Sequence, residues 1–151
     1  MPDALDLEHF LPYRLSVLSN RISDAIAREY SERFALGVTE WRVMAVLGRW
    51  PGSTASQVAQ RTAMDKVAVS RAVARLADAG RLSRVADAGD RRRTLLRLSP
   101  EGQAIHDEVV PQALAFERRV LEGIPPGDRD VLFRLIGRLD ELELRAEADP
   151  A

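Results

Sequence analysis

The fold is decided by residues 54–80, which read TASQVAQRTAMDKVAVSRAVARLADAG. Thr54 and Gln57 have the spacing of a capping box, which predicts a short helix at the start of this stretch. After a brief turn, Asp65 is a good N-cap for a second helix, and Gly80 is a typical C-terminal stop. A short helix, a tight turn and a second helix together predict a helix-turn-helix arrangement.

The second helix, about residues 66–79, has two different faces. Val69, Val73 and Leu76 lie at i, i+4 and i+7 and form an inward stripe. Small side chains dominate the outer face, which favours entry into the major groove of duplex DNA, about 12 Å wide. The predicted contact residues of the two helices are Ser56, Gln57, Lys66, Val67, Ala68, Ser70, Arg71 and Arg75. A solvated, alanine-rich face is the alternative interpretation.

Beyond the second helix the hydrophobic spacing becomes alternating. Leu82 and Val85 lie among polar residues, and residues 94–98 predict a second short strand. Residues 86–93 between them are rich in turn formers and predict the tip of a β-hairpin. Consecutive arginines at such a tip suit the anionic minor groove, about 6 Å wide, although a solvated charge run is the alternative. These arginines are Arg91, Arg92 and Arg93.

Amphipathic helices are predicted on both sides of this region. Residues 12–35 place apolar side chains at alternating spacings of 4 and 3, and residues 128–147 repeat that pattern. Thr39 is the predicted cap of a helix that turns Trp41 inward. The end helices have more apolar surface than one small winged domain can cover, which is compatible with pairing with a second chain.

The predicted class is therefore mainly α (α+β), a winged helix-turn-helix with a two-stranded β wing. Residues 37–99 form the predicted DNA-binding domain. Residues 1–36 and 100–151 form the predicted helical dimerisation region.

Composition and charge agree with this class. The chain has 151 residues, of which 46% are hydrophobic and 30% charged, and it has no Cys. Residues 1–50 have net charge −1 (6 basic, 7 acidic), residues 51–100 have +6 (10 basic, 4 acidic) and residues 101–151 have −6 (6 basic, 12 acidic). A basic middle segment is the electrostatic footprint of a polyanion-binding surface. That segment has no aromatic residue, which favours duplex DNA over single strands.

Other function classes find no support in the sequence. There is no basic leader, and no apolar run approaches the roughly 20 residues that span a bilayer, so a cytoplasmic protein without a membrane partner is expected. His9 and His106 stand alone, without Cys or clustered carboxylates, so neither a metal nor a cofactor is expected. The sequence lacks the catalytic motifs of an enzyme. A helical adaptor protein without sequence-specific DNA binding remains the alternative function.

The sequence resembles the MarR family of winged helix-turn-helix transcription factors. Residues 90–102, DRRRTLLRLSPEG, are similar to the family's wing pattern of Asp-x-Arg, a strand and Leu-Thr/Ser-x-x-Gly, on which Asp90 and Arg92 occupy the motif positions. The resemblance implies that Asp90 structures the wing and that Arg92 enters the minor groove. It further implies a homodimer that binds a pseudo-palindromic operator, with half-sites about 10 bp apart, as a repressor.

The resemblance also implies release by a small effector, an aromatic carboxylate, a phenolic compound or an acyl-CoA. The cleft between the dimer helices and the winged domain is the expected site. The candidate lining residues are Tyr13, Arg14 and Trp41. Arg14 suits a carboxylate and the aromatic rings suit a ring system, whereas an inter-helix salt bridge for Arg14 and a core position for Trp41 are the alternatives.

Overall fold

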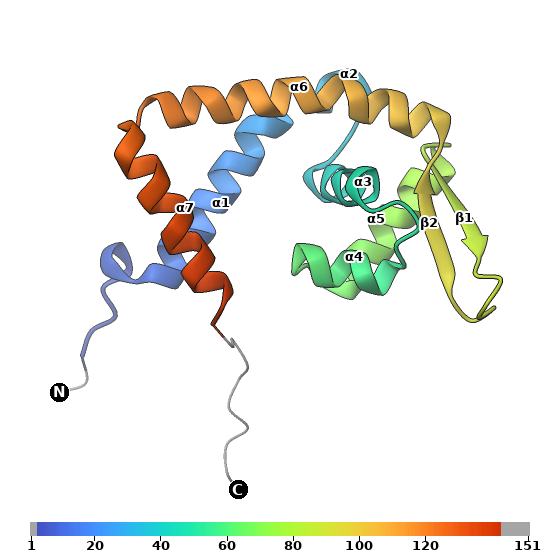
Figure 1. Ribbon diagram of the computed structural model, residues 1–151, viewed down its shortest axis with the longest axis horizontal. Coiled ribbons are helices and arrows are strands. Elements are labelled where there is room, and N and C mark those ends of the chain that lie inside the picture. The colour runs from blue at the N-terminus through green and yellow to red at the C-terminus, as the bar shows by residue number, and fades with distance from the viewer. Residues whose placement is uncertain (1–2, 143–151) are drawn as a thin grey trace, which may run out of the picture. The chain divides into compact units, whose positions relative to one another are not determined.

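The computed structural model describes residues 3–142, which fall into two compact units divided between Ala113 and Leu114. Figure 1 shows the helices and the single hairpin. The elements are η1 (Leu7–His9), α1 (Leu11–Ala27), α2 (Ser31–Phe34), α3 (Val38–Arg49), α4 (Ala55–Thr62), α5 (Lys66–Asp78), β1 (Leu82–Ala86), β2 (Thr94–Leu98), α6 (Pro100–Glu122) and α7 (Pro126–Asp140). Among these residues, no helix has the length and apolar character needed to cross a membrane.

The core of the first unit is built by α3, α4, α5 and the hairpin, which lie together in Figure 1. The predicted inward stripe of α5 is confirmed, because Val69, Val73 and Leu76 are all buried. They pack with Met44 and Leu47 of α3 in one apolar cluster. Burial of such side chains stabilises each by about 1.5–3 kcal/mol and fixes α5 on the domain.

The predicted helix caps of this region are confirmed. The amide of Gln57 donates to Thr54 Oγ1 at 3.2 Å, and the amide of Thr54 donates to Gln57 Oε1 at 2.9 Å. The Asp65 carboxylate accepts from the amide of Ala68 at 3.4 Å. α5 ends at Asp78, and Gly80 follows with φ +73°, a left-handed conformation that suits glycine.

The predicted wing is also confirmed. β1 and β2 pair antiparallel, with Leu82 opposite Leu98 and Ala86 opposite Thr94. On its other edge β2 pairs with Ser53, whose carbonyl accepts from the amide of Leu96 at 2.9 Å. The hairpin is thereby attached to the segment that leads into α4.

A serine and a glycine join the base of the wing to α6. The Ser99 hydroxyl donates to the Gly80 carbonyl at 2.6 Å and accepts from the amide of Gly102 at 3.0 Å. The amide of Ser99 donates to the Arg81 carbonyl at 3.1 Å. A Cβ at Gly102 would overlap that same carbonyl oxygen, so the Ser-x-x-Gly spacing is required for α6 to begin against Arg81, the residue before β1.

Two boundary predictions in the first unit are wrong. The expected helix over 12–35 ends at Ala27, and the short α2 follows after a break. The break lets Tyr30 enter the core, where it is 1% exposed. The following α3 begins after Gly37, which occupies the N-cap position, rather than after Thr39, which lies inside the helix.

The second unit contains the end of α6 and α7. α7 ends at Asp140, and the part of the predicted last helix beyond residue 142 lies outside the described residues. Neither α7 nor α1 of the first unit has a buried residue in the single chain. Their exposed large apolar residues are Leu11, Tyr13, Leu15, Val17 and Leu18 in α1, and Val131, Leu132, Phe133, Leu135 and Ile136 in α7.

Candidate DNA-binding surface

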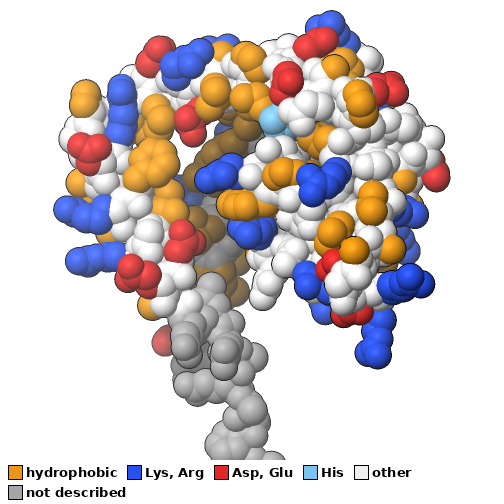
Figure 2. All heavy atoms as spheres, turned by 45° about the vertical axis from the view of Figure 1, so that its right-hand side comes forward, with side chains coloured by type: hydrophobic (Ala, Val, Ile, Leu, Met, Phe, Trp, Pro, Cys, Tyr) orange, Lys and Arg blue, Asp and Glu red, His pale blue; other side chains and the backbone are white. Residues whose placement is uncertain are grey.

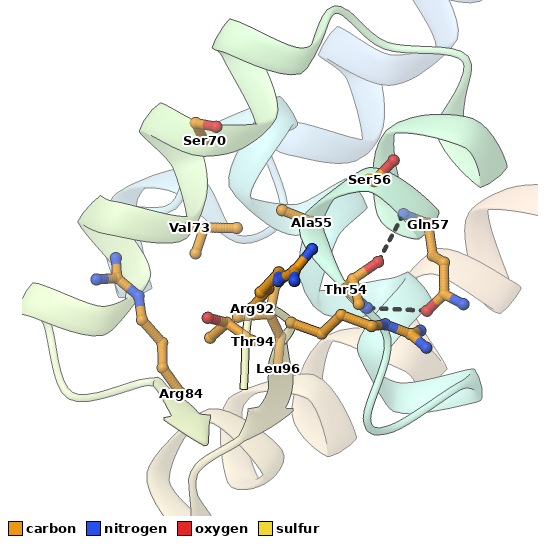
Figure 3. A pocket seen from close by; sticks show the side chains of 11 residues that line it. Thr54, Ala55, Ser56, Gln57, Ser70, Val73, Arg84, Arg92, Thr94 and Leu96 are labelled. Atoms are coloured by element: carbon orange, nitrogen blue, oxygen red, sulfur yellow. Dashed lines mark hydrogen bonds between the residues drawn. The ribbon is translucent and has the colours of Figure 1, made fainter. Parts of the chain in front are cut away.

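A groove with a cavity volume of about 690 Å³ lies between α4, α5 and the wing. Figure 3 shows its walls, with Ser56 on α4, Ser70 on α5, Arg84 on β1 and Arg92 at the wing. Its lining residues are Thr54, Ala55, Ser56, Gln57, Ser70, Val73, Arg84, Arg92, Arg93, Thr94 and Leu96. The groove therefore brings together predicted contact residues from all three elements.

The wing tip is held by one aspartate. Asp90 Oδ1 accepts from the amide of Arg92 at 3.1 Å, and the Asp90 carbonyl accepts from the amide of Arg93 at 3.0 Å. The carbonyl of Arg93 in turn accepts from the amide of Asp87 at 2.9 Å. A short polar side chain that bonds to the backbone two residues on is the usual way to fix a tight turn. Asp90 thus shapes the turn that presents the arginines.

The cations of the groove differ in their partners. Arg93 Nη1 lies 4.0 Å from the Asp87 carboxylate, a weak and exposed pair. Arg84 and Arg92 make no ion pair with any residue between 3 and 142. Unpaired guanidinium groups facing one groove form a site for an anion.

Arg84 is a groove residue that no sequence motif predicts. It lies two positions after the buried Leu82 on β1, and alternate residues of a strand share a face. This alternation is the sequence signal that could have identified Arg84 as a groove residue.

The outer face of α5 is exposed as predicted at Lys66, Val67, Ser70 and Arg71. Val67, a large apolar side chain, is 54% exposed. Arg75 differs, because its Nη1 lies 3.3 Å from Glu40 Oε1 on α3. The Glu40 side chain is only 14% exposed, so Arg75 also anchors α5 to α3. Figure 2 shows Lys and Arg side chains over the visible face of the molecule, with a group of them at its lower right.

The three predicted effector residues lie in different surroundings. Trp41 lines a pocket of about 170 Å³ between α1 and α3, and its ring centroid lies 5.7 Å from that of Tyr30. Arg14 lines a separate pocket of about 140 Å³ on α1, and its guanidinium donates to the Glu8 carbonyl at 2.9 Å. Tyr13 is exposed on α1 and lines neither of these pockets. The single chain does not unite the three residues.

The Trp41 pocket holds a different cation, which the sequence analysis did not single out. Arg42 Nη2 donates to Ser23 Oγ at 2.7 Å, and both residues line the pocket. Burial raises the pKa of Tyr30, which also lines this pocket, from 10.0 to about 12, against the opposing effect of Arg42. Tyr30 is therefore neutral at physiological pH and contributes a ring and a hydroxyl group.

No group of three or more His, Cys, Asp or Glu side chains within residues 3–142 is arranged to hold a metal. His106 instead packs beside Trp41, with ring centroids 5.8 Å apart, and Gly48 leaves room for its ring. Hydrogen bonds from His106 and Gln103 lower the pKa of the Asp107 carboxyl.

The fold and the groove define a winged helix-turn-helix protein. Residues 36–93 match the model of the MarR family. This match covers the winged helix-turn-helix region of the chain. No curated protein matches the sequence.

Solved structures of MarR-type regulators share the whole fold. A MarR family regulator from Silicibacter pomeroyi has 22% sequence identity and a TM-score of 0.78, covering 97% of this chain and 100% of its own. BpsR of Bordetella bronchiseptica, whose DNA binding is regulated by 6-hydroxynicotinic acid, has 21% identity and a TM-score of 0.80, covering 93% and 100%. The repressor CouR bound to a 23-mer DNA duplex has 20% identity and a TM-score of 0.76, covering 91% and 99%.

Proposed function

We propose that this chain is a repressor that binds a specific duplex operator through the groove between α4, α5 and the wing. The observation that carries the proposal is the convergence of Ser70, Arg84 and Arg92 from three elements on one groove. α5 would enter the major groove with Ser70, Val67 and Ala68 near base edges, since Ser accepts or donates and apolar side chains contact thymine methyl groups. Arg92 would reach the minor groove, and Arg91 and Arg93 the adjacent phosphates.

We also propose a homodimer as the active form. Exposed apolar side chains on α1 and α7, with no buried residue in either helix, support it. Such surfaces are costly in a monomer and are typical of obligate interfaces. A twofold dimer would read a pseudo-palindrome with half-sites about one helical turn apart.

Selection from a random duplex pool, followed by sequencing, tests the repressor. The expected result is a pseudo-palindromic site bound by a dimer. Arg92→Ala should weaken binding to that site and lower the magnitude of the slope of log K against log salt by about 0.9 for each phosphate that the variant no longer neutralises. Failure to enrich any site would favour the adaptor function instead.

We propose that an aromatic carboxylate is the effector and that it binds in the Trp41 pocket. Tyr30 and Trp41 supply ring surface, and Arg42 supplies a guanidinium for the carboxylate. The regulation of BpsR by 6-hydroxynicotinic acid, a ring carboxylate, supports this chemical class. Phenolic compounds and acyl-CoA thioesters are the other predicted classes.

Arg14 and Arg42 are the two candidate anchors for the carboxylate. A thermal-shift screen of aromatic acids and acyl-CoAs identifies a ligand, which at 100 times its Kd adds about 2.7 kcal/mol of stability. Arg42→Ala should abolish the shift, whereas Arg14→Ala should preserve it because Arg14 lies in a separate pocket. If Arg14→Ala abolishes the shift and Arg42→Ala preserves it, the effector binds at Tyr13 and Arg14 instead.

A further inference from the structure

A second group of arginines surrounds Trp50, outside the groove lining. The Arg61 guanidinium carbon lies 3.8 Å from the Trp50 ring centroid, and that of Arg49 lies 5.3 Å from it. The Arg97 guanidinium covers the adjacent turn, where a Cβ on Gly52 would lie 3.4 Å from its Nη2. Arg49, Trp50, Arg61 and Arg97 are called the arginine–tryptophan cluster below.

The cluster concentrates positive charge without a carboxylate. The two distances to Trp50 sum to 9.1 Å, so the Arg49 and Arg61 guanidinium carbons are at most that far apart. Even this upper limit is close to one Debye length at physiological salt, about 8 Å, so their repulsion is only partly screened. None of the three arginines forms an ion pair with any residue between 3 and 142. An anion from outside the chain would relieve this repulsion.

The Trp50 ring makes the cluster a better anion site than three free side chains. Trp50 is 39% exposed, so its ring is accessible at the surface. Stacking on an indole ring holds a guanidinium in one orientation while its N–H groups remain able to donate. Less side-chain freedom is then lost when a phosphate binds.

The cluster borders the groove along α4. Arg61 lies one helical turn after Gln57 on the same face of α4, and Gln57 lines the groove. Arg97 follows Leu96, another groove residue, on β2, so its side chain leaves the opposite face of the strand, toward Gly52. A duplex that extends beyond the groove past Gln57 would therefore run beside Arg61.

We propose that the arginine–tryptophan cluster binds backbone phosphates of operator DNA that lie outside the base pairs read by α5 and the wing. The proposal rests on the proposed function, since it extends the footprint of the same duplex. It assigns Arg49 and Arg61 as phosphate contacts, Trp50 as the platform that orients them, and Arg97 as a third cation. An acidic protein surface is the competing occupant, because Trp and Arg are also frequent at protein interfaces.

The test uses the duplex recovered by selection, prepared in two lengths. The short form ends at the last selected base pair, and the long form adds about ten base pairs, one helical turn, on each side. Affinity is measured between 50 and 200 mM salt for the wild-type chain, for Arg49→Ala and Arg61→Ala singly and together, and for Arg118→Ala. Arg118 is an exposed arginine on α6 in the second unit and serves as the matched charge control.

We expect the wild-type chain to bind the long duplex more tightly and with a steeper salt dependence than the short one. Each phosphate contact contributes about 0.9 to the magnitude of the slope, which is about a 3.5-fold change in affinity over this salt range. The double variant should lose the advantage of the long duplex, and Arg118→Ala should keep it. In a Trp41→Phe background, where Trp50 is the single tryptophan, only the long duplex should change the emission spectrum.

The outcomes separate the two proposals. If no duplex is enriched, the proposed function fails. If a duplex is enriched but both lengths bind equally, or the double variant retains the advantage of the long form, the proposal for the cluster alone is overturned. Unchanged DNA binding in all variants would assign the cluster to another partner.

Discussion

Gly102→Ala tests how the wing is attached to the rest of the domain. Gly102 is the third residue of α6, a position at which alanine ordinarily stabilises a helix by about 0.5–1 kcal/mol over glycine. Here the new Cβ would overlap the Arg81 carbonyl oxygen and lie 2.9 Å from its carbonyl carbon. Ordinary contacts lie at 3.4–4 Å, so the carbon alone must move by at least 0.5 Å.

The cost follows from what that movement disturbs. Overpacking against a rigid atom costs about 1–3 kcal/mol. The shift also strains the two hydrogen bonds of the Ser99 hydroxyl and the bond from its amide to Arg81, each worth about 0.5–1.5 kcal/mol net. We therefore expect a net destabilisation of about 3 kcal/mol, and weaker operator binding because β1 is displaced.

Urea unfolding followed by circular dichroism, at one fixed protein concentration, measures the change. The midpoint should fall by about 1–3 M for a slope of about 1–3 kcal/mol per molar urea. Gly127→Ala is the matched control, since Gly127 lies in the first turn of α7 and a Cβ there meets nothing within 4 Å. An unchanged or raised midpoint for Gly102→Ala would refute the steric argument.

Three further predictions concern the wing, the core and the dimer. Asp90→Ala removes the acceptor of the Arg92 amide and should lower the affinity for the operator. The dimer should stay intact in analytical ultracentrifugation. Unchanged affinity would contradict the turn-forming role of Asp90. Burial raises the pKa of Tyr30 from 10.0 to about 12, so the folded state favours the neutral phenol. This contribution to the free energy of unfolding, about 2–3 kcal/mol, is fully present below pH 10 and is lost as pH rises toward 12. Tyr30→Phe should remove that pH dependence of urea unfolding. Leu135→Glu places a charge on the apolar face of α7, where Leu135 is 49% exposed in the single chain. Because burying an unpaired charge is costly, this variant should be a monomer in light scattering. A stable dimer would show that α7 does not form the interface.

Local signals in the sequence account for the helix-turn-helix and the wing. The Thr54 and Asp65 caps act within three residues of themselves, and the α5 stripe follows from helical periodicity alone. Asp90 likewise acts on its immediate neighbours. Features determined by neighbouring residues are therefore predictable from the sequence.

Features determined by tertiary packing are not. The apolar spacing over 12–35 continues past Ala27, yet the chain breaks there because a buried Tyr30 is more favourable than three more helical residues. Similarly, the sequence predicts Trp41 beside Arg14, but the cation that shares its pocket is Arg42. Neither the break nor the pocket has a short-range signal, because each depends on how α1 meets α3.

The charge of the middle segment shows the same distinction at the proposed DNA-binding surface. Its net charge of +6 counts every cation equally, whereas the fold divides them among different tasks. Arg75 is paired with Glu40, a residue 35 positions away, and the Arg81 guanidinium donates to the Phe34 carbonyl at 2.5 Å at the base of the wing. Arg84, which no motif singled out, is unpaired in the groove. Because only cations that neutralise phosphates release counterions, the salt dependence of DNA binding should be smaller than the segment's cation count implies.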